Sequence, residues 1–155
     1  MIRKAELSDV NDIIQTIRPY HKESMFKEKR IGNEDRLFMT VHNSVMGDGW
    51  TTLLSITDRS ISGILIAYEN YSFYDDSEMD IDFYYIPKEY RGSGVSRELI
   101  KAIKNIAIKR KIGIMYCGCH SNMADGGKNN NLFVNLFKKY GFEETGTNLH
   151  LEIGY

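Results

Sequence analysis

Two segments in the first third of the chain have apolar residues three or four positions apart. This spacing places the apolar side chains on one face and predicts two amphipathic helices. Ser8 and Asn33 stand before the two segments, and both residue types commonly cap the start of a helix. Gly47-Asp48-Gly49 is expected to end the second helix. The apolar residues of the two helices are Val10, Ile13, Ile14 and Ile17, then Leu37, Phe38, Val41 and Val45.

Residues with high β-propensity dominate the middle of the chain. Trp50 to Thr57 and Ile61 to Tyr68 predict a hairpin around Asp58-Arg59-Ser60, and Ile2 to Ala5 is an earlier short strand. The acidic and aromatic stretch from Glu69 to Met79 is predicted to be a loop.

The segment from Asp80 to Ile86 alternates in the way that a strand with two different faces does. Two sets of side chains are therefore expected on opposite faces. The sets are Asp80, Asp82, Tyr84 and Ile86 on one face, and Ile81, Phe83 and Tyr85 on the other.

A third helix and a further strand follow. Helical spacing from Val95 to Ile106 ends at Gly113, and Ile114 to Cys119 is predicted to be a strand. Because a helix joins this strand to Asp80–Ile86, the two strands are expected to be parallel neighbours. The remaining expected elements are a helix with Leu132, Leu136 and Tyr140 that ends at Gly141, and strands at Phe142 to Thr145 and Leu149 to Ile153.

The 155 residues are 42% hydrophobic and 26% charged, which suits one folded domain over residues 1–155. The formal net charge is −1, so no strong positive field favours nucleic acid as a partner. There is no apolar run of about 20 residues and no secretory leader pattern. We therefore expect no membrane partner and a cytoplasmic location.

Cysteine occurs only in Cys117-Gly118-Cys119-His120. Side chains one residue apart on a strand point to opposite faces, so a disulfide between the two cysteines is not expected. These residues also suggest metal ligands, but a structural zinc site usually needs a second ligand pair, and none is visible. We therefore expect no metal and interpret the segment as a buried strand with small residues.

The stretch Glu89-Tyr90-Arg91-Gly92-Ser93-Gly94-Val95-Ser96 joins the alternating strand to the third helix. A glycine-rich turn before a helix offers backbone N–H groups at the positive end of the helix dipole, which favours phosphate or pyrophosphate. The turn is not a Walker A loop, and Arg97 stands where a dinucleotide fingerprint has its last glycine. A plain connection between strand and helix is the alternative interpretation.

Residues Tyr84 to Ser96 resemble the signature of the GNAT superfamily of acyl-CoA-dependent N-acetyltransferases. Its core pattern is Arg/Gln-x-x-Gly-x-Gly/Ala after the fourth strand. Arg91 and Gly94 match this pattern, whereas Ser96 replaces the usual Gly or Ala. The family resemblance extends to Ile2-Arg3-Lys4-Ala5 with Asp9, and to the segment from Asn130 to Phe142. A narrower resemblance, to phage-encoded GNAT proteins, rests on Tyr20-His21-Lys22-Glu23-Ser24.

The resemblance covers essentially the whole chain and implies the GNAT fold. That fold is α/β (α+β), with a mixed central sheet of about six to seven strands and flanking helices. It implies acetyl-CoA as co-substrate, with its pyrophosphate on the turn and its pantetheine arm beside the preceding strand. The residues implied to bind acetyl-CoA are Tyr84, Tyr85, Ile86, Arg91, Gly92, Ser93, Gly94, Val95, Ser96 and Asn130.

Acetyl transfer to an amine requires a neutral nitrogen, but an alkyl ammonium has a pKa of about 10.4, so a base is required. Asp80 and Asp82 are the candidate bases. Two carboxylates on one face raise one another's pKa, or together hold a cationic substrate. Tyr140 is a candidate acid, because Phe137 stands where many family members have a tyrosine. The Ile86 N–H is a candidate donor to the oxyanion.

The acceptor is predicted from Tyr74 and Glu78, which belong to the aromatic and acidic stretch before the alternating strand. Acids and aromatic faces attract ammonium groups, which favours a primary amine of a small cationic molecule or of a protein. A solvated hairpin edge with protective charges is the alternative. Phe137 and Ser96 favour an alternative function, a binding or accessory protein that retains the CoA groove without transfer. GNAT proteins often dimerise, so a homodimer is also implied.

Overall fold

The computed structural model describes residues 1–23, 33–71, 77–118 and 134–144. The chain divides into two compact units, Met1–Cys117 and Gly118–Tyr155, and each unit is described by itself. The expectation of one domain over residues 1–155 stays a prediction.

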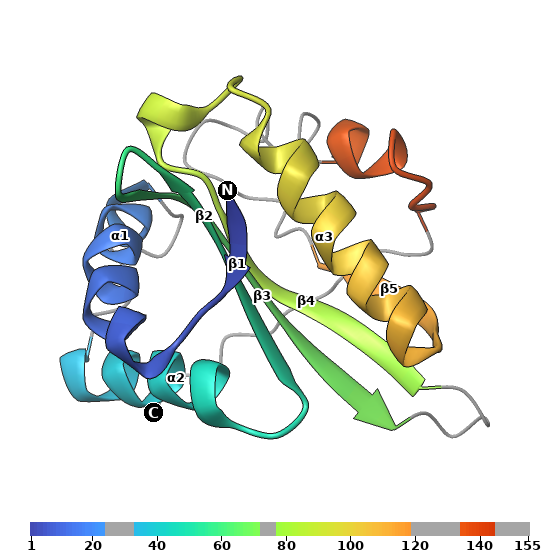
Figure 1. Cartoon of the computed structure of the whole chain (residues 1–155), viewed down its shortest axis with the longest axis horizontal. Helices are drawn as coiled ribbons and strands as arrows, with labels where there is room; N and C mark the ends of the chain where they lie inside the picture. The colour runs from blue at the N-terminus through green and yellow to red at the C-terminus, as the bar shows by residue number, and fades with distance from the viewer. Residues whose placement is uncertain (24–32, 72–76, 119–133, 145–155) are drawn as a thin grey trace, which may run out of the picture. The chain divides into compact units, whose positions relative to one another are not determined.

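Five strands of the first unit form one mixed sheet (Figure 1). Their bounds are β1 (Ile2–Lys4), β2 (Trp50–Thr57), β3 (Ser60–Tyr71), β4 (Ser77–Tyr85) and β5 (Ile112–Cys117). The strands follow one another in this order across the sheet, antiparallel from β1 to β4 and parallel between β4 and β5. The helix α3 (Val95–Arg110) connects β4 to β5, which confirms the predicted parallel pair.

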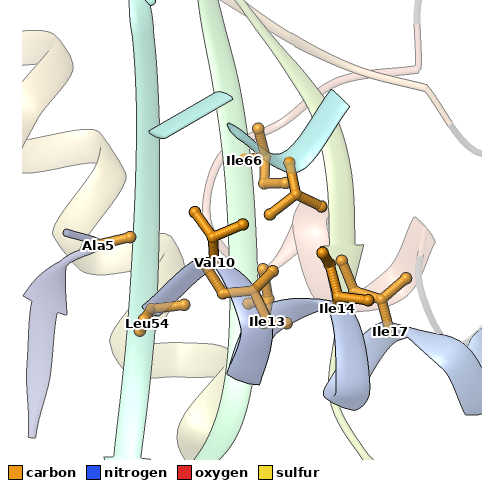
Figure 2. Packing of buried hydrophobic residues seen from close by; sticks show 9 residues of the cluster. Ala5, Val10, Ile13, Ile14, Ile17, Leu54 and Ile66 are labelled. Atoms are coloured by element: carbon orange, nitrogen blue, oxygen red, sulfur yellow. The ribbon is translucent and has the colours of Figure 1, made fainter. Parts of the chain in front are cut away.

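Helices cover both faces of this sheet (Figure 1). α1 (Val10–Glu23) and α2 (Glu34–Met46) lie on one face, and α3 lies on the other. Figure 2 shows the apolar side chains of α1 packed against Leu54 of β2 and Ile66 of β3, which confirms the predicted apolar face. No helix in the described ranges is long and apolar enough to span a membrane. The buried cluster on this face is Ala5, Val10, Ile13, Ile14, Ile17, Val41, Leu54, Ile64 and Ile66.

α2 begins as the sequence predicts, because the Asn33 side chain accepts the Arg36 N–H at 2.9 Å. Its apolar face is narrower than predicted. Phe38 is 44% exposed and stacks on His42, with ring centroids 6.0 Å apart. The reason is geometric, since the buried stripe of the helix passes through Val41 and leaves Phe38 at its margin.

The start of α1 differs from the prediction. Ser8 is exposed and lies inside a 3₁₀ turn, η1 (Leu7–Asp9), so it is not the N-cap. Asp9 organises this turn instead, because its carboxylate accepts the Glu6 N–H at 2.8 Å. The same carboxylate accepts two hydrogen bonds from the Arg3 guanidinium, at 2.6 and 2.7 Å. This pair ties β1 to the start of α1.

Asp9→Asn is expected to lower the free energy of unfolding by about 1–3 kcal/mol at pH 7, because it removes a bidentate ion pair. The hydrogen bond from Arg3 holds the pKa of Asp9 below its ordinary value of 3.8, although burial opposes this shift. A lowered folded-state pKa gives stability that is present above the unfolded pKa and is lost as the pH falls through the folded one.

Urea unfolding of both proteins between pH 7 and pH 2 measures this contribution. The advantage of the wild type over Asp9→Asn should be constant near neutrality and shrink below about pH 4. As a control, Asp12→Asn changes an exposed acid in the first turn of α1. It should lower the free energy of unfolding by less than about 0.5 kcal/mol. If the two variants lost the same free energy of unfolding at pH 7, the Arg3–Asp9 ion pair would not be the stabilising interaction.

The hairpin between β3 and β4 is longer than predicted. A loop from Glu69 to Met79 is wrong, because β3 continues to Tyr71 and β4 begins at Ser77. Glu69 pairs with Met79 within the described part of the hairpin. Cross-strand hydrogen bonding extends both strands into polar sequence that has little β-propensity of its own. The earlier hairpin is confirmed, since β2 and β3 pair directly up to Thr57 with Ser60.

Gly63 on β3 allows α3 to lie close to the sheet. A Cβ at this position would lie 2.6 Å from Val95 Cγ1, 2.7 Å from Ile86 Cδ1 and 2.9 Å from Leu99 Cδ1. These distances are far below van der Waals contact, so a larger residue forces neighbouring side chains or the helix to move. Gly63 therefore sets the position of the start of α3.

Gly63→Ala is expected to lower the free energy of unfolding by about 1–3 kcal/mol, because it overpacks this contact. Urea unfolding measures the loss. Val95→Ala removes the nearest neighbouring carbon, so the double variant should lose less than the sum of the two single losses. Strictly additive losses would show that the Cβ does not meet Val95.

The second unit is described only at residues 134–144. Residues 134–138 are helical, so the predicted helix ends before Tyr140, and its predicted member Leu132 lies outside the described residues. Gly141 ends the turn as predicted, with φ of +88° and its N–H bonded to Lys138 O at 3.0 Å.

The predicted closing strands of the chain are not part of the described sheet. Residues 142–144 are not in a strand, and 145 and 149–153 lie outside the described residues. The ring of Phe142 packs edge-on against Phe137, with centroids 5.0 Å apart. The described sheet has five strands, fewer than the six to seven that the resemblance implied.

Candidate active site

The ladder between β3 and β4 contains a β-bulge, in which β4 has one extra residue. Ile81 pairs with Ala67, and Phe83 pairs with Ile66, so Asp82 is the extra residue of a β-bulge. A bulge places every later side chain on the face opposite to the one that simple alternation predicts. The bulge therefore decides which side chains of β4 share a face.

The predicted grouping of Asp80 with Tyr84 is wrong for this reason. Asp80 pairs with Tyr68 and Tyr84 pairs with Leu65. Since Tyr68 and Leu65 are three positions apart on β3, their side chains lie on opposite faces, and so do their partners.

Phe83 and Tyr85 share the face of Asp80, which is the face that α1 and α2 cover. Both rings contact Tyr20 of α1 edge-on, with centroids 5.1 and 5.5 Å from the Tyr20 ring. Tyr85 is only 4% exposed. Its expected contribution to acetyl-CoA binding is thus limited to its backbone.

The ladder between β4 and β5 ends before β4 does. Its last register pair is Ile81 with Cys117, where β5 ends, whereas β4 continues to Tyr85. Beyond Ile81, β4 thus continues past the described end of its parallel neighbour.

The turn before α3 holds backbone amides that are open to a ligand. Gly92 and Gly94 have φ of +85° and +89°, a conformation that favours glycine. The first backbone bond into α3 runs from Glu98 N–H to Gly94 O at 3.2 Å, and the amides of residues 95–97 have no acceptor in the described part of the chain. A Cβ at Gly92 would meet nothing within 4 Å. The geometry therefore fits an anion.

The side chains of Arg91 and Ser93 donate hydrogen bonds to backbone carbonyls within this segment. Arg91 Nε donates to Ile86 O at 3.0 Å, and its guanidinium carbon lies 6.0 Å from the centroid of the Tyr85 ring. The N–H and hydroxyl of Ser93 both donate to Tyr90 O, at 3.3 and 2.6 Å. These two residues shape the turn, while the free amides come from the start of the helix.

Asp80 lies on β4 beside a residue that the sequence did not single out. Its Oδ2 accepts a hydrogen bond from Asn70 Nδ2 at 2.6 Å, and the carboxylate is half-buried. Across the sheet, Asp80 has Tyr68 of β3 and Tyr116 of β5 as register partners. Asn70 belongs to the stretch predicted to be a loop, so only strand register brings it to Asp80. Glu78 follows on the same face as the partner of Asn70.

Several predicted residues are not placed with this group. Tyr74 and Asn130 lie outside the described residues, and Tyr140 belongs to the second unit. Within the described ranges, no group of three or more His, Cys, Asp and Glu residues is arranged to hold a metal ion. Cys119 and His120 lie outside those ranges. The roles given to Tyr74, Asn130 and Tyr140 stay predictions.

A mixed sheet with a parallel β4–β5 pair, and a glycine-rich turn between β4 and the connecting helix, is typical of a GNAT-fold acyltransferase. The model of the acetyltransferase (GNAT) family matches residues 14–142 of this sequence. The chain belongs to the GNAT family of acetyltransferases. None of the curated proteins matches it.

Solved structures share this fold at low sequence identity. A possible acetyltransferase from Clostridium difficile 630 is 20% identical, with a TM-score of 0.77 over 100% of this chain and 97% of that one. A ribosomal-protein-alanine N-acetyltransferase from Brucella melitensis biovar Abortus 2308 is 14% identical, with a TM-score of 0.74 over 99% of both chains. An aminoglycoside acetyltransferase from an uncultured soil metagenomic sample, in complex with sisomicin, is 13% identical, with a TM-score of 0.77 over 99% of this chain and 96% of that one.

Proposed function

We propose that this protein transfers the acetyl group of acetyl-CoA to a primary amine of a small cationic molecule or of a protein. The observation that carries the proposal is the set of acceptor-free amides at residues 95–97, which follow a β4 strand that continues past the described end of β5. A diphosphate and an extended pantetheine chain need these two features side by side. Membership of the GNAT family supports the same co-substrate.

The residues present fit acetyl-CoA. The turn offers positive-φ glycines with open space above Gly92, so the pyrophosphate would lie on the acceptor-free amides at the start of α3, residues 95–97. The pantetheine arm would lie beside Tyr84–Ile86, and Asn130 stays a predicted cofactor-binding residue. Bound acetyl-CoA supplies an activated acyl carbon; the protein holds and orients it.

Asp80 is the base that we propose, with Asp82 as the alternative. A base must take a proton so that the acceptor nitrogen is neutral when it attacks. Asp80 is half-buried and oriented by Asn70, whereas Asp82 is exposed at the bulge. The Ile86 N–H is proposed to donate to the oxyanion, and Tyr140 stays a candidate proton donor.

A cationic amine is the acceptor that we propose. Asp80 and Glu78 place two carboxylates on one face of β4, and Tyr74 is predicted to be close to them. Acceptors named for two structural neighbours, an aminoglycoside and a ribosomal-protein alanine, are amines of this kind. The cytoplasmic location and a homodimer stay predictions from the sequence.

The second candidate function is a GNAT-fold binding protein that retains the CoA groove without transfer. Phe137 supports this alternative function, because its side chain has no proton to donate and is only 4% exposed. Ser96 adds to it by departing from the usual glycine or alanine.

Thiol release from acetyl-CoA, measured over a panel of polyamines, aminoglycosides and lysine peptides, separates the two functions. We expect release with at least one cationic amine, together with a thermal shift on adding acetyl-CoA. Binding without turnover on any acceptor would favour the binding protein. The absence of a thermal shift would contradict both functions.

A further inference from the structure

The proposed transfer needs a group that donates a proton to the departing sulfur, and the first unit contains one beside Asp80. We propose that the phenol of Tyr116 on β5 is this donor, an inference that rests on the proposed function. Tyr116 is the register partner of Asp80 in the parallel β4–β5 ladder. The next pair, Ile81 with Cys117, is the last of the described ladder.

The strand register places the two side chains next to each other. Partners on neighbouring strands lie about 4.8 Å apart and project to the same face of the sheet. Tyr68, Asp80 and Tyr116 therefore form one row across β3, β4 and β5, on the face that α1 and α2 cover. The row lies one register pair before the described end of the β4–β5 ladder, and the pantetheine arm is proposed to lie beyond that end.

Tyr116 is the tyrosine of this row whose ring is left accessible. Its relative exposure is 39%, whereas Tyr85, further along β4 on the same face, is only 4% exposed. Tyr68 packs on Trp50 with ring centroids 4.8 Å apart. Tyr68 and Tyr85 are thus used in packing, and Tyr116 combines an acidic proton with access to a substrate.

The proton steps balance with Asp80 and Tyr116 alone. Asp80 takes the ammonium proton and releases it to solvent, the neutral amine nitrogen forms a bond to the acyl carbon, and Asp80 then takes the second proton that this nitrogen loses. The carbon–sulfur bond breaks, its electron pair stays on sulfur, and the Tyr116 hydroxyl gives its proton to that sulfur. The phenolate then recovers a proton from the Asp80 carboxylic acid beside it, directly or through one water. The products are an amide and a thiol, and no oxidant or reductant is needed.

Tyr116→Phe is expected to lower kcat about 10²-fold, the lower end of the usual effect of a general acid, with little change in the KM for acetyl-CoA. Tyr71→Phe is the matched control, since Tyr71 is 95% exposed and its pairing with Ser77 places it on the opposite sheet face. The control should keep the wild-type kcat. Unchanged kcat in Tyr116→Phe, or a loss confined to KM, would overturn the inference.

A binding experiment tests the contact without turnover. The variant Tyr116→3-fluorotyrosine gives a single ¹⁹F signal at the proposed donor. We expect this signal to shift more with CoA than with desulfo-CoA, which lacks only the sulfur, because the phenol contacts that atom. The same label at Tyr71 should not respond. Equal shifts with the two ligands at position 116 would contradict the contact with sulfur.

The outcomes separate this inference from the function on which it rests. If the wild type releases no thiol with any amine, the proposed transfer fails and the donor role fails with it. If the wild type is active and Tyr116→Phe is equally active, only the donor role fails. Tyr140→Phe, measured in parallel, then shows whether the candidate from the second unit supplies the proton.

Discussion

Asp80→Asn is expected to lower kcat/KM at neutral pH by about 10²- to 10⁴-fold, the usual contribution of a positioned general base. The change keeps the size of the side chain and leaves an oxygen for the hydrogen bond from Asn70. Folding should therefore be preserved, which urea unfolding checks. The deficit should become smaller as the pH approaches the pKa of the free amine, about 10.4, because solution then supplies neutral nucleophile.

Two matched variants make the result specific to the position of the carboxylate. Asp58→Asn removes an acid from the β2–β3 turn, where asparagine tolerates the φ of 50°, and should leave the rate unchanged. Asp82→Asn tests the alternative base at the bulge. A wild-type kcat/KM in Asp80→Asn across the whole pH range would show that Asp80 is not the base. A large loss of kcat/KM in Asp82→Asn alone would assign the role of base to Asp82.

Gly94→Ala is expected to raise the Kd for acetyl-CoA about 10- to 100-fold, which corresponds to losing one or two charge-assisted hydrogen bonds. Gly94 has φ of +89° and begins α3, so an alanine there is strained and turns the first amides of the helix away from their anion. Titration calorimetry with acetyl-CoA measures the change. S-acetylpantetheine lacks the pyrophosphate, so its Kd should be nearly the same for the wild type and the variant.

The control for strain is Gly49→Ala at the start of β2. Gly49 has φ of +79°, and a Cβ there would lie 3.1 Å from Tyr68 Cε2, so this variant should lose stability. It should nevertheless keep its affinity for acetyl-CoA at temperatures where it is folded. If Gly94→Ala weakened acetyl-CoA and S-acetylpantetheine equally, the turn would not be the pyrophosphate site.

The helices and the parallel strand pair could be predicted because each depends on local periodicity. The spacing of Val10, Ile13 and Ile17 needs only one sheet face to pack against, whichever strands supply it. Likewise, a strand, a glycine-rich turn, a helix and a second strand can pack compactly only as a right-handed parallel crossover. The glycine-rich turn before α3 was predictable for the same reason, since it depends on neighbouring residues from Gly92 to Ser96.

The arrangement around Asp80 was not predictable from such patterns. Alternation along one strand carries no mark of a bulge, because the extra residue exists only relative to the partner strand. The same is true of Asn70, which the β3–β4 register brings to 2.6 Å from Asp80. The start of α1 also escaped prediction, since Asp9 is held there by Arg3 from β1 rather than by the local capping preference of Ser8.

By itself, the sequence determined the class of the protein: a GNAT-family chain with a glycine-rich turn before its third helix. The tertiary structure decided which carboxylate and which phenol are register partners on β4 and β5, and that Gly63 admits α3 against the sheet. The physical reason is the range of the interactions. Helical spacing and turn chemistry depend on residues a few positions apart, whereas a bulge, a strand register and a close helix–sheet contact depend on segments that meet only in the folded chain.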